Sequence, residues 1–392
     1  MTKVMHIITT LGPAGAEIML SNIISGMDRT RFENEVVSLT DILDLAEKMR
    51  GIGAGVRTLN MKRSAPNPLL VMRLAQWIRE SKPDVIHTWM YHANLVGVLA
   101  ARLAGNVPVV WGIHHSTLDP RVDKRRTLLV NRICAFLSRR FPARIVCCSE
   151  ASLRIHKNLR YAAEKMEVIP NGFDLEQVKP DYAARASVRQ ELGIPLDAPL
   201  IGIAARFHPL KDHFNFVSAA ARLHQQIPKA HFLMCGLDIT WQNSQLTEWI
   251  ETAGISDCCH LLGLRHDMSR LFSGIDIATT ASRSEAFPIA IGEAMACGTP
   301  CVVTDVGDCA LIVEATGIVV APRDPCALAE GWRNLIEAGP RVRHRLGMAA
   351  RRRVQQHFAL PTIVDRYQTI YSRLAAGAVQ VLPSASLSQI AQ

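Results

Sequence analysis

Short apolar runs alternate with amphipathic segments along most of the chain. Strands are predicted in the first half at Val4–Thr9, Glu35–Leu39, Val56–Leu59, Val85–Thr88, Val107–Gly112 and Arg144–Cys148. Segments with helical spacing separate these runs, for example Leu69–Glu80 and Ala93–Leu103. Strands that alternate with helices indicate a parallel α/β sheet with helices on its faces.

The second half repeats this pattern. Strands are predicted at Leu200–Ala205, His231–Cys235, Cys259–Leu262, Ile275–Thr279, Pro300–Thr304 and Gly317–Val320. The turn residues Ile169–Gly172 follow a short strand and predict the boundary between two doubly wound domains. We therefore expect a first domain at residues 1–172, a second at 173–376 and a flexible tail at 377–392. Such domains bind ligands at the carboxyl ends of their strands, so we expect the ligand in the cleft between them.

Length and composition support two globular domains. The chain has 392 residues, of which 48% are apolar and 20% charged. The longest candidate for a membrane span, Asn94–Ile113, is interrupted by Arg102, Asn106 and Pro108. The apolar N-terminus runs into a glycine loop, so we interpret it as a strand and not as a signal peptide. The ten cysteines show no C-x-x-C pair or zinc spacing, which favours reduced thiols in a cytoplasmic protein.

The positive charge belongs to the first half. Residues 1–175 hold 24 Lys and Arg against 15 Asp and Glu, so this half accounts for the net charge of +9. The asymmetry predicts a polyanionic or membrane-surface partner, and no nucleic-acid motif accompanies it. The segment Arg121–Arg144 places cations beside Leu128, Leu129, Ile133, Phe136 and Leu137. It fits a helix at an anionic membrane surface, or equally a solvated basic helix packed on the sheet.

Two carboxylates, Glu285 and Glu293, stand eight positions apart around an apolar stretch. A loop that presents the first carboxylate and opens a helix carrying the second can direct both to one ligand. The N–H groups at the start of that helix favour negative charge. Two solvated glutamates are the plainer interpretation of such a pair taken alone.

Two further loops carry groups that suit a phosphate. Residues Leu11–Glu17 follow the first strand with small residues, although they lack G-x-G-x-x-G and also suit a plain tight turn. Arg206 ends the first strand of the second domain, and Lys211 follows five residues later near a helix start. A guanidinium and an ammonium placed in this way can neutralise a diphosphate, although solvated surface cations are the common alternative.

His114 and His115 end the strand before Ser116, which places an imidazole at the expected cleft edge. A structural histidine is the competing interpretation. The spacing of partner residues does not fit a metal site, and the sequence contains no Asp-x-Asp that would hold a divalent ion on a diphosphate. We therefore predict no metal.

Taken together, these segments resemble a glycosyltransferase of family 4. The resemblance spans nearly the whole chain and includes Gly-Ala-Glu at 15–17, IPNGFD at 169–174, and E-x7-E with EAMACGTPCVVTDVGD through residue 308. It implies the GT-B fold, with two Rossmann-like domains facing across a cleft and C-terminal helices that can cross back to the first. It also implies metal-independent, retaining transfer from a UDP- or GDP-linked sugar, with no further cofactor.

The resemblance assigns a role to each candidate residue. Glu285 would contact the donor sugar, the backbone at Phe287 and Ile289 would face sugar and phosphate, and Glu293 would bind the ribose. In the same way, Arg206 and Lys211 would neutralise the leaving diphosphate, Gly15 and Ala16 would close on it, and His115 would lie beside the anomeric carbon. Many members have glycine where this chain has Ala286, so the donor sugar stays open.

The expected acceptor is a glycan or a lipid-linked molecule of bacterial surface polysaccharide or glycolipid synthesis. The enzyme would then work in the cytoplasm, on the inner face of the membrane. Two alternatives remain. One is a sugar-nucleotide epimerase or a sugar-phosphate synthase on the same fold, and the other is a catalytically silent subunit of a partner transferase. Arg206, Lys211, Glu285 and Glu293 together argue against the silent subunit.

Overall fold

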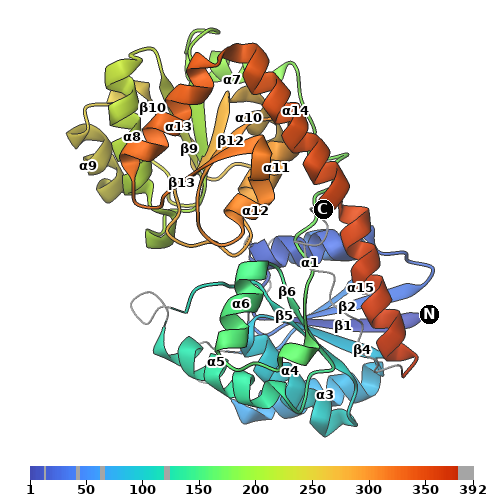
Figure 1. Cartoon of the computed structure of the whole chain (residues 1–392). Helices are drawn as coiled ribbons and strands as arrows, with labels where there is room; N and C mark the ends of the chain where they lie inside the picture. Colours follow the sequence, from blue (N-terminus) through green and yellow to red (C-terminus); the bar gives the residue numbers. More distant parts are fainter. Residues whose placement is uncertain (13–14, 41–44, 62–66, 119–123, 378–392) are drawn as a thin grey trace. The chain divides into compact units, whose positions relative to one another are not determined.

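A computed structural model describes residues 1–12, 15–40, 45–61, 67–118 and 124–377, which form two compact units (Figure 1). The first unit contains residues 1–172 and the chain from Leu360 onward, and the second contains Phe173–Ala359. The predicted division instead leaves residues 173–376 in one domain. Of the predicted tail at 377–392, residues 378–392 lie outside the described residues.

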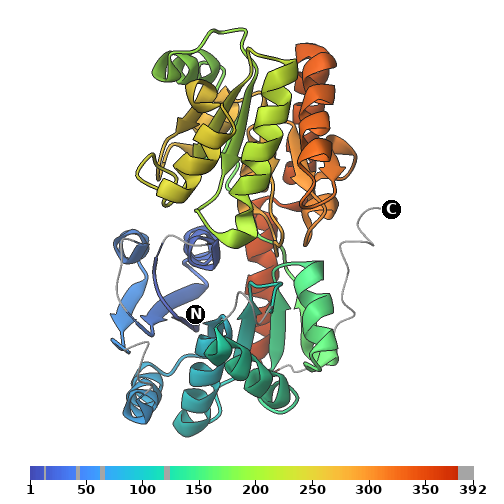
Figure 2. The ribbon, with the colours of Figure 1, turned by 90° about the vertical axis from the view of Figure 1, so that its left-hand side faces the viewer.

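The first unit is built on a parallel sheet in the order β3-β2-β1-β4-β5-β6-β7. Its strands are β1 (Thr2–Ile8), β2 (Phe32–Ser38), β3 (Gly55–Thr58), β4 (Val85–Trp89), β5 (Val109–Ile113), β6 (Arg144–Cys147) and β7 (Met166–Val168). The central strands β4 and β5 are buried at every residue, because helices cover both faces of the sheet (Figures 1 and 2).

The helices of this unit follow the strands in the expected alternation. They are α1 (Gly15–Gly26), α2 (Leu45–Gly51), α3 (Pro68–Ser81), α4 (Tyr91–Ala104), α5 (Arg125–Ser138), α6 (Glu150–Asn158), the short η1 (Ala163–Lys165) and α15 (Leu360–Ala375). The start of α3 shows why a helix begins there. The Asn67 side chain accepts a hydrogen bond from the Leu69 N–H, and proline occupies the first turn.

The second unit has a parallel sheet in the order β10-β9-β8-β11-β12-β13. Its strands are β8 (Leu200–Ala204), β9 (His231–Cys235), β10 (Cys259–Leu261), β11 (Ile277–Thr280), β12 (Cys301–Thr304) and β13 (Gly317–Val320). In each sheet the order reverses once, between β1 and β4 and between β8 and β11. The predicted pair of Rossmann-like sheets is confirmed.

Helices cover both faces of the second sheet as well (Figure 2). They are α7 (Ala184–Leu192), α8 (His213–Gln226), α9 (Ser244–Thr252), α10 (Met268–Gly274), α11 (Ile289–Ala296), α12 (Cys309–Val313), α13 (Pro325–Glu337), α14 (Gly339–His357) and the short η2 (Pro209–Lys211), η3 (Ser256–Cys258) and η4 (Glu314–Thr316). At α13 the Asp324 side chain accepts from the Ala327 N–H, again with proline in the first turn.

The last helix, α15, completes the core of the first unit. Its apolar face, which includes Ile363, Val364 and Tyr367, packs into the same cluster as Met19 of α1. The Tyr371 hydroxyl shares a 2.6 Å hydrogen bond with Nδ1 of the buried His87. Because α15 covers apolar surface of β1 and β4, it belongs to the first unit although it ends the described chain.

Within the described residues no helix is long and apolar enough to cross a membrane. The ten cysteines are free thiols, nine of them buried and Cys326 exposed. Burial raises the pKa of several of these thiols, for example that of Cys301. The nine buried cysteines act as small apolar residues in the two cores.

Candidate active site

The candidate site of the second unit lies at the carboxyl ends of β8 and β11, where the strand order reverses. The loop after β8 carries Arg206 and Lys211, and the loop after β11 carries Glu285. One backbone hydrogen bond of 2.8 Å, from the Arg283 N–H to the Leu210 carbonyl, joins these loops. Residues far apart in sequence are thereby held at the edge where this fold binds ligands.

Lys211 and Glu285 form an ion pair at this edge. Nζ of Lys211 lies 2.5 Å from Oε1 of Glu285, and the side chains are 26% and 10% exposed. The same carboxylate oxygen accepts a 2.7 Å hydrogen bond from the Ser282 hydroxyl. Strong charge-assisted bonds therefore fix the orientation of the Glu285 carboxylate.

A second ion pair holds the two loops in register. Arg283 donates from Nε to Oδ2 of Asp212 at 2.6 Å and from Nη2 to Oδ1 at 2.7 Å. Asp212 is buried, and its backbone is in the left-handed region with φ of +50°. It directly follows Lys211. The pair raises the pKa of Arg283 and fixes the loop position from which Lys211 reaches Glu285.

Arg206 is exposed and follows the end of β8. The loop after β9 lies close to the backbone at this point. The Ala205 N–H donates to the Cys235 carbonyl of β9 at 2.9 Å. Gly236 follows with φ of +142°, and a Cβ on it would lie 2.3 Å from the Ala205 carbonyl oxygen. Glycine is required here because no side chain fits between the two loops.

The ring of Phe287 packs in the core, so only the backbone of this residue can contact a ligand. The ring is buried and stands 6.2 Å from that of Phe173 and 5.6 Å from that of Phe358, measured between centroids. A Cβ on Gly292 of α11 would lie 2.0 Å from the Phe173 ring, so the helix starts directly against this aromatic group. In the described part of the chain no side chain caps α11, which begins at Ile289. Its first N–H groups are the donors predicted for negative charge.

Glu293 lies on α11 and is half-buried. Burial raises the pKa of its carboxyl group to about 7, because desolvation disfavours the charged form. A carboxyl group that titrates near neutrality at a strand-end site is typical of a functional residue.

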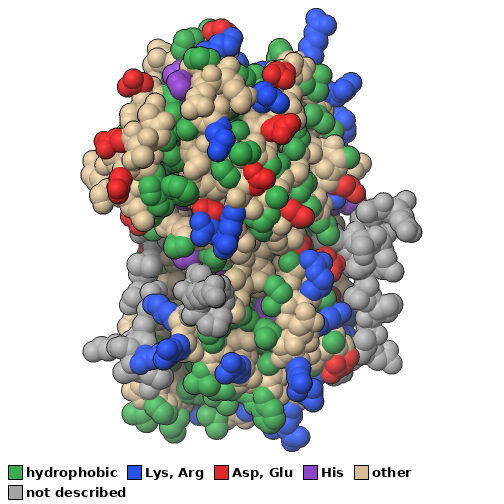
Figure 3. Space-filling model, turned by 60° about the vertical axis from the view of Figure 1, so that its left-hand side comes forward, with side chains coloured by type: hydrophobic (Ala, Val, Ile, Leu, Met, Phe, Trp, Pro, Cys, Tyr) green, Lys and Arg blue, Asp and Glu red, His purple; other side chains and the backbone are tan. Residues whose placement is uncertain are grey.

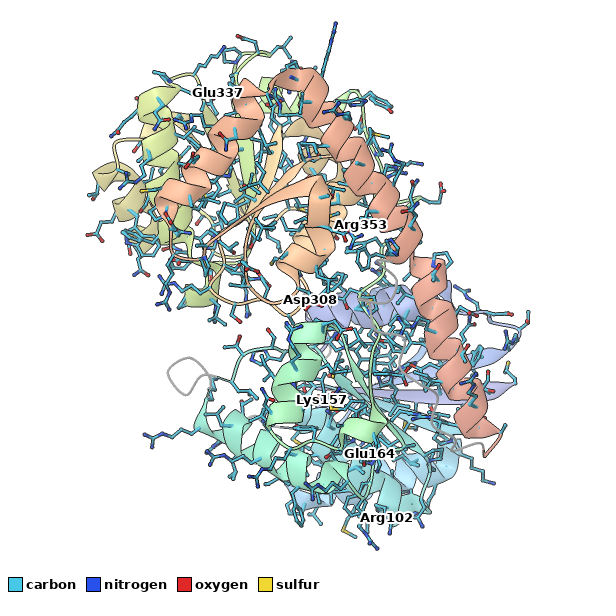
Figure 4. The ribbon with its side chains drawn as sticks, viewed as in Figure 1. Arg102, Lys157, Glu164, Asp308, Glu337 and Arg353 are labelled. Atoms are coloured by element: carbon cyan, nitrogen blue, oxygen red, sulfur yellow. The ribbon has the colours of Figure 1, made fainter. Side chains whose placement is uncertain are left out.

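A third loop, after β12, supports the backbone of Glu285. Gly307 has φ of +59°, and a Cβ on it would lie 2.0 Å from the Glu285 carbonyl oxygen. The next residue, Asp308, donates its N–H to the Ala286 carbonyl at 3.2 Å (Figure 4 labels Asp308). Together with Asp212, Arg283 and Ser282, this loop is the part of the site that the sequence did not predict.

The predicted residues of the first unit stand at the corresponding strand ends. Gly15 and Ala16 open α1, and two residues of the preceding loop, 13 and 14, lie outside the described residues. The carbonyl of His115 accepts a 2.8 Å hydrogen bond from the Ser152 hydroxyl, and its ring meets that of Tyr91 edge-on. His114 instead stacks on the Trp89 ring at 4.9 Å, and burial lowers its pKa to about 4. Its packing is that of a neutral structural histidine.

No group of three or more His, Cys, Asp or Glu side chains that could hold a metal occurs among the described residues. The groups at this strand edge that suit an anion are the side chains of Arg206 and Lys211 and the first N–H groups of α11. These are the donors expected to stabilise a departing diphosphate.

Two family models match the two units in turn. The model for Glycosyltransferase Family 4 matches residues 13–177, and the model for Glycosyl transferases group 1 matches residues 184–353. The chain belongs to the family 4 glycosyltransferases. The predicted family and its transferase activity are confirmed.

Curated relatives of this glycosyltransferase are similar over about three quarters of its length. It is 25% identical to the UDP-Gal:α-D-GlcNAc-diphosphoundecaprenol α-1,3-galactosyltransferase of Escherichia coli, over 73% of this chain and 74% of that one. It is 26% identical to the N,N'-diacetylbacillosaminyl-diphospho-undecaprenol α-1,3-N-acetylgalactosaminyltransferase of Campylobacter jejuni, over 71% and 74%.

The crystal structure of Anabaena HepE in complex with UDP and glucose shares the fold of this glycosyltransferase. The TM-score is 0.84 at 24% sequence identity, and the match covers 95% of this chain and 100% of the other. The likeness extends over both units and establishes the GT-B architecture.

Proposed function

We propose that this glycosyltransferase moves a hexose or N-acetylhexosamine from a UDP-linked donor to a hydroxyl of a lipid-linked sugar acceptor. The single observation that carries the proposal is the Lys211–Glu285 pair at the strand-order reversal. It combines a cation for a phosphate with a carboxylate for sugar hydroxyls. The names of the Escherichia coli and Campylobacter jejuni relatives, both of which act on diphosphoundecaprenol-linked sugars, support the acceptor class.

Each residue of the site has a role in this proposal. Glu285 accepts hydrogen bonds from donor sugar hydroxyls, and Glu293 accepts them from the ribose. Arg206 and Lys211, with the N–H groups at the start of α11, stabilise the charge on the diphosphate. The backbone around Phe287 and Ile289 lines the sugar and phosphate, since the Phe287 ring is buried in the core.

We propose transfer with retention at the anomeric carbon and without a metal. The acceptor oxygen bonds to the anomeric carbon on the face from which the diphosphate leaves, and the bond from that carbon to the phosphate oxygen breaks. The acceptor proton passes to the departing phosphate oxygen, so the reaction requires no dedicated base. The fixed cations stabilise the negative charge that develops on the phosphate.

We further propose that the enzyme acts at the inner face of the membrane. A lipid-linked acceptor lies at the membrane surface, and the excess of Lys and Arg in residues 1–175 favours an anionic one. The free thiols suit a reducing compartment.

Thermal-shift measurements with UDP-, GDP- and ADP-sugars test the donor, because a bound donor raises the melting temperature by mass action. We expect stabilisation by a UDP-sugar. Transfer is then assayed with a polyprenyl-diphosphate-linked sugar in the presence and absence of a metal chelator, and the anomeric configuration of the product is determined by NMR. Donor binding with no transfer to any such acceptor would contradict the proposed acceptor class. Loss of activity with chelator, or an inverted product, would contradict the mechanism.

A further inference from the structure

The outer face of α5 in the first unit carries an exposed apolar stripe. Leu129, Ile133 and Phe136 are 57%, 37% and 80% exposed, and their spacing of four and three residues aligns them on one side of the helix. The opposite side, with Asn131, Cys134, Ala135 and Ser138, is buried against the unit. The stripe therefore faces outward on a helix whose inner side is already packed.

Arginines flank the stripe on both sides. At 3.6 residues per turn, Arg125 and Arg132 fall beside one edge of the stripe and Arg126 beside the other. Arg139 and Arg140 follow at the end of the helix and are exposed. Neither α5 nor the neighbouring α4 contains an acidic residue, and α3 contains one, Glu80, against Arg73 and Arg79. The apolar groups thus lie in a positively charged surround.

The face continues over the two preceding helices, since α4 packs against both α3 and α5. Leu99 and Leu103 of α4 are exposed, as are Leu69 and Met72 of α3. Arg102 of α4, which Figure 4 labels, lies among them, over the Phe141 ring. Figure 3 shows hydrophobic and basic side chains gathered together over the lower unit. Exposed apolar side chains on three neighbouring helices are typical of an interaction site.

We propose that this face of α3, α4 and α5 docks on an anionic lipid bilayer, with Phe136 as the main apolar anchor. The proposal rests on the proposed lipid-linked acceptor and adds the surface by which the enzyme reaches it. Apolar side chains insert at the boundary between headgroups and acyl chains, while the nearby cations are attracted to the anionic headgroups. A second copy of the chain is a poor occupant, because like-charged arginines would face each other.

Flotation with vesicles of phosphatidylcholine, with and without phosphatidylglycerol, tests the proposal. We expect binding only to the anionic vesicles and weaker binding at high salt. Phe136→Ser should lower the partition coefficient by about tenfold, since a buried phenylalanine is lost. Tyr182→Ser is the matched control, because Tyr182 is an aromatic residue of the second unit that is 85% exposed.

The double variant Arg125→Glu/Arg132→Glu tests the charges separately. It should lower binding to the anionic vesicles by about tenfold or more. Arg345→Glu/Arg352→Glu on exposed positions of α14 makes the same change of net charge elsewhere. Unchanged melting temperature and unchanged stabilisation by UDP-sugar show that each variant is folded. Glu285→Gln should float like the wild type, so the docking result does not depend on transferase activity.

Three outcomes would overturn the proposal. They are equal flotation with neutral and anionic vesicles, wild-type binding by Phe136→Ser, and a lipid-free dimer that Phe136→Ser dissociates. The last result would assign the face to an interface between copies, which sedimentation velocity would detect.

Discussion

Lys211 Nζ lies 2.5 Å from Glu285 Oε1, so a cation suited to phosphate and a carboxylate suited to sugar hydroxyls hold each other in place. The Ser282 hydroxyl donates to the same oxygen at 2.7 Å. A donor that engages both residues must share or replace these bonds. The orientation of Glu285 is therefore set before the donor arrives, which lowers the cost of binding in the productive geometry.

Glu285→Gln keeps the shape of this side chain and removes its charge. We expect kcat/KM to fall by about a hundredfold, because the bonds to the sugar and to Lys211 lose their charge-assisted character. Steady-state kinetics measure the effect, and the melting temperature checks the fold. Glu251→Gln, an exposed change on α9, should leave the kinetics unchanged. Transfer by Glu285→Gln at the native rate would remove Glu285 from the site.

Arg283→Lys tests whether the pair with Asp212 positions the site. Lysine retains the charge but cannot bond both Asp212 oxygens as the guanidinium does. The loop that carries Lys211 should therefore no longer be held in one position. We expect kcat to fall by about tenfold with little change in melting temperature. Arg333→Lys on α13, a half-buried arginine that pairs with Glu337, provides the control. An equal loss of stability and activity would indicate a purely structural role.

The architecture could be predicted because each strand carries its own local signal. The apolar runs that end near Ala204 and Thr304 are buried strands in the structure. The place of α15 has no such local signal, and only the family resemblance implied that C-terminal helices can cross back to the first unit. It depends on partners such as His87, which bonds Tyr371 across nearly the whole sequence. An amphipathic pattern gives a helix its buried face and does not say which sheet will cover it.

The same distinction applies to the site. Lys211 and Glu285 were predicted from residue type and position, and the structure pairs them. Asp212, Arg283 and Gly307 act through contacts between loops that are remote in sequence. A single sequence shows neither the positive φ of Gly307 nor its approach to the Glu285 carbonyl, so their roles required the structure.

Gly307→Ala should displace the Glu285 backbone, because the new Cβ would lie 2.0 Å from the Glu285 carbonyl oxygen. We expect that the UDP-sugar donor will no longer raise the melting temperature of this variant in a thermal-shift assay. Gly254→Ala is a close control: its φ of +67° matches the +59° of Gly307, and its Cβ would meet nothing within 4 Å. Both variants incur the backbone cost of about 1 kcal/mol, and only the first moves the site. Equal donor binding by the two variants would contradict the role of this loop.

The pKa of about 7 for Glu293 predicts two opposite responses to pH. In the folded protein the carboxyl group holds its proton more tightly than a glutamate with the ordinary pKa of 4.5 does. The stability that this proton provides is complete below about pH 4.5 and is lost as the pH rises to about 7. Glu293→Gln keeps a neutral side chain at every pH, so its melting temperature should exceed that of the wild type at pH 8 and approach it below about pH 4.5.

Donor binding should respond in the other direction, because only the carboxylate accepts hydrogen bonds from both ribose hydroxyls. The affinity for the UDP-sugar should rise with pH through about 7, and binding at pH 6 should release a proton. Calorimetry in two buffers of different ionisation enthalpy measures that proton directly. Glu293→Gln should bind more weakly at pH 8 and show neither proton release nor a change of affinity between pH 6 and 8. If the variant keeps the wild-type pH profile, another group carries the titration and the ribose contact is not made by Glu293.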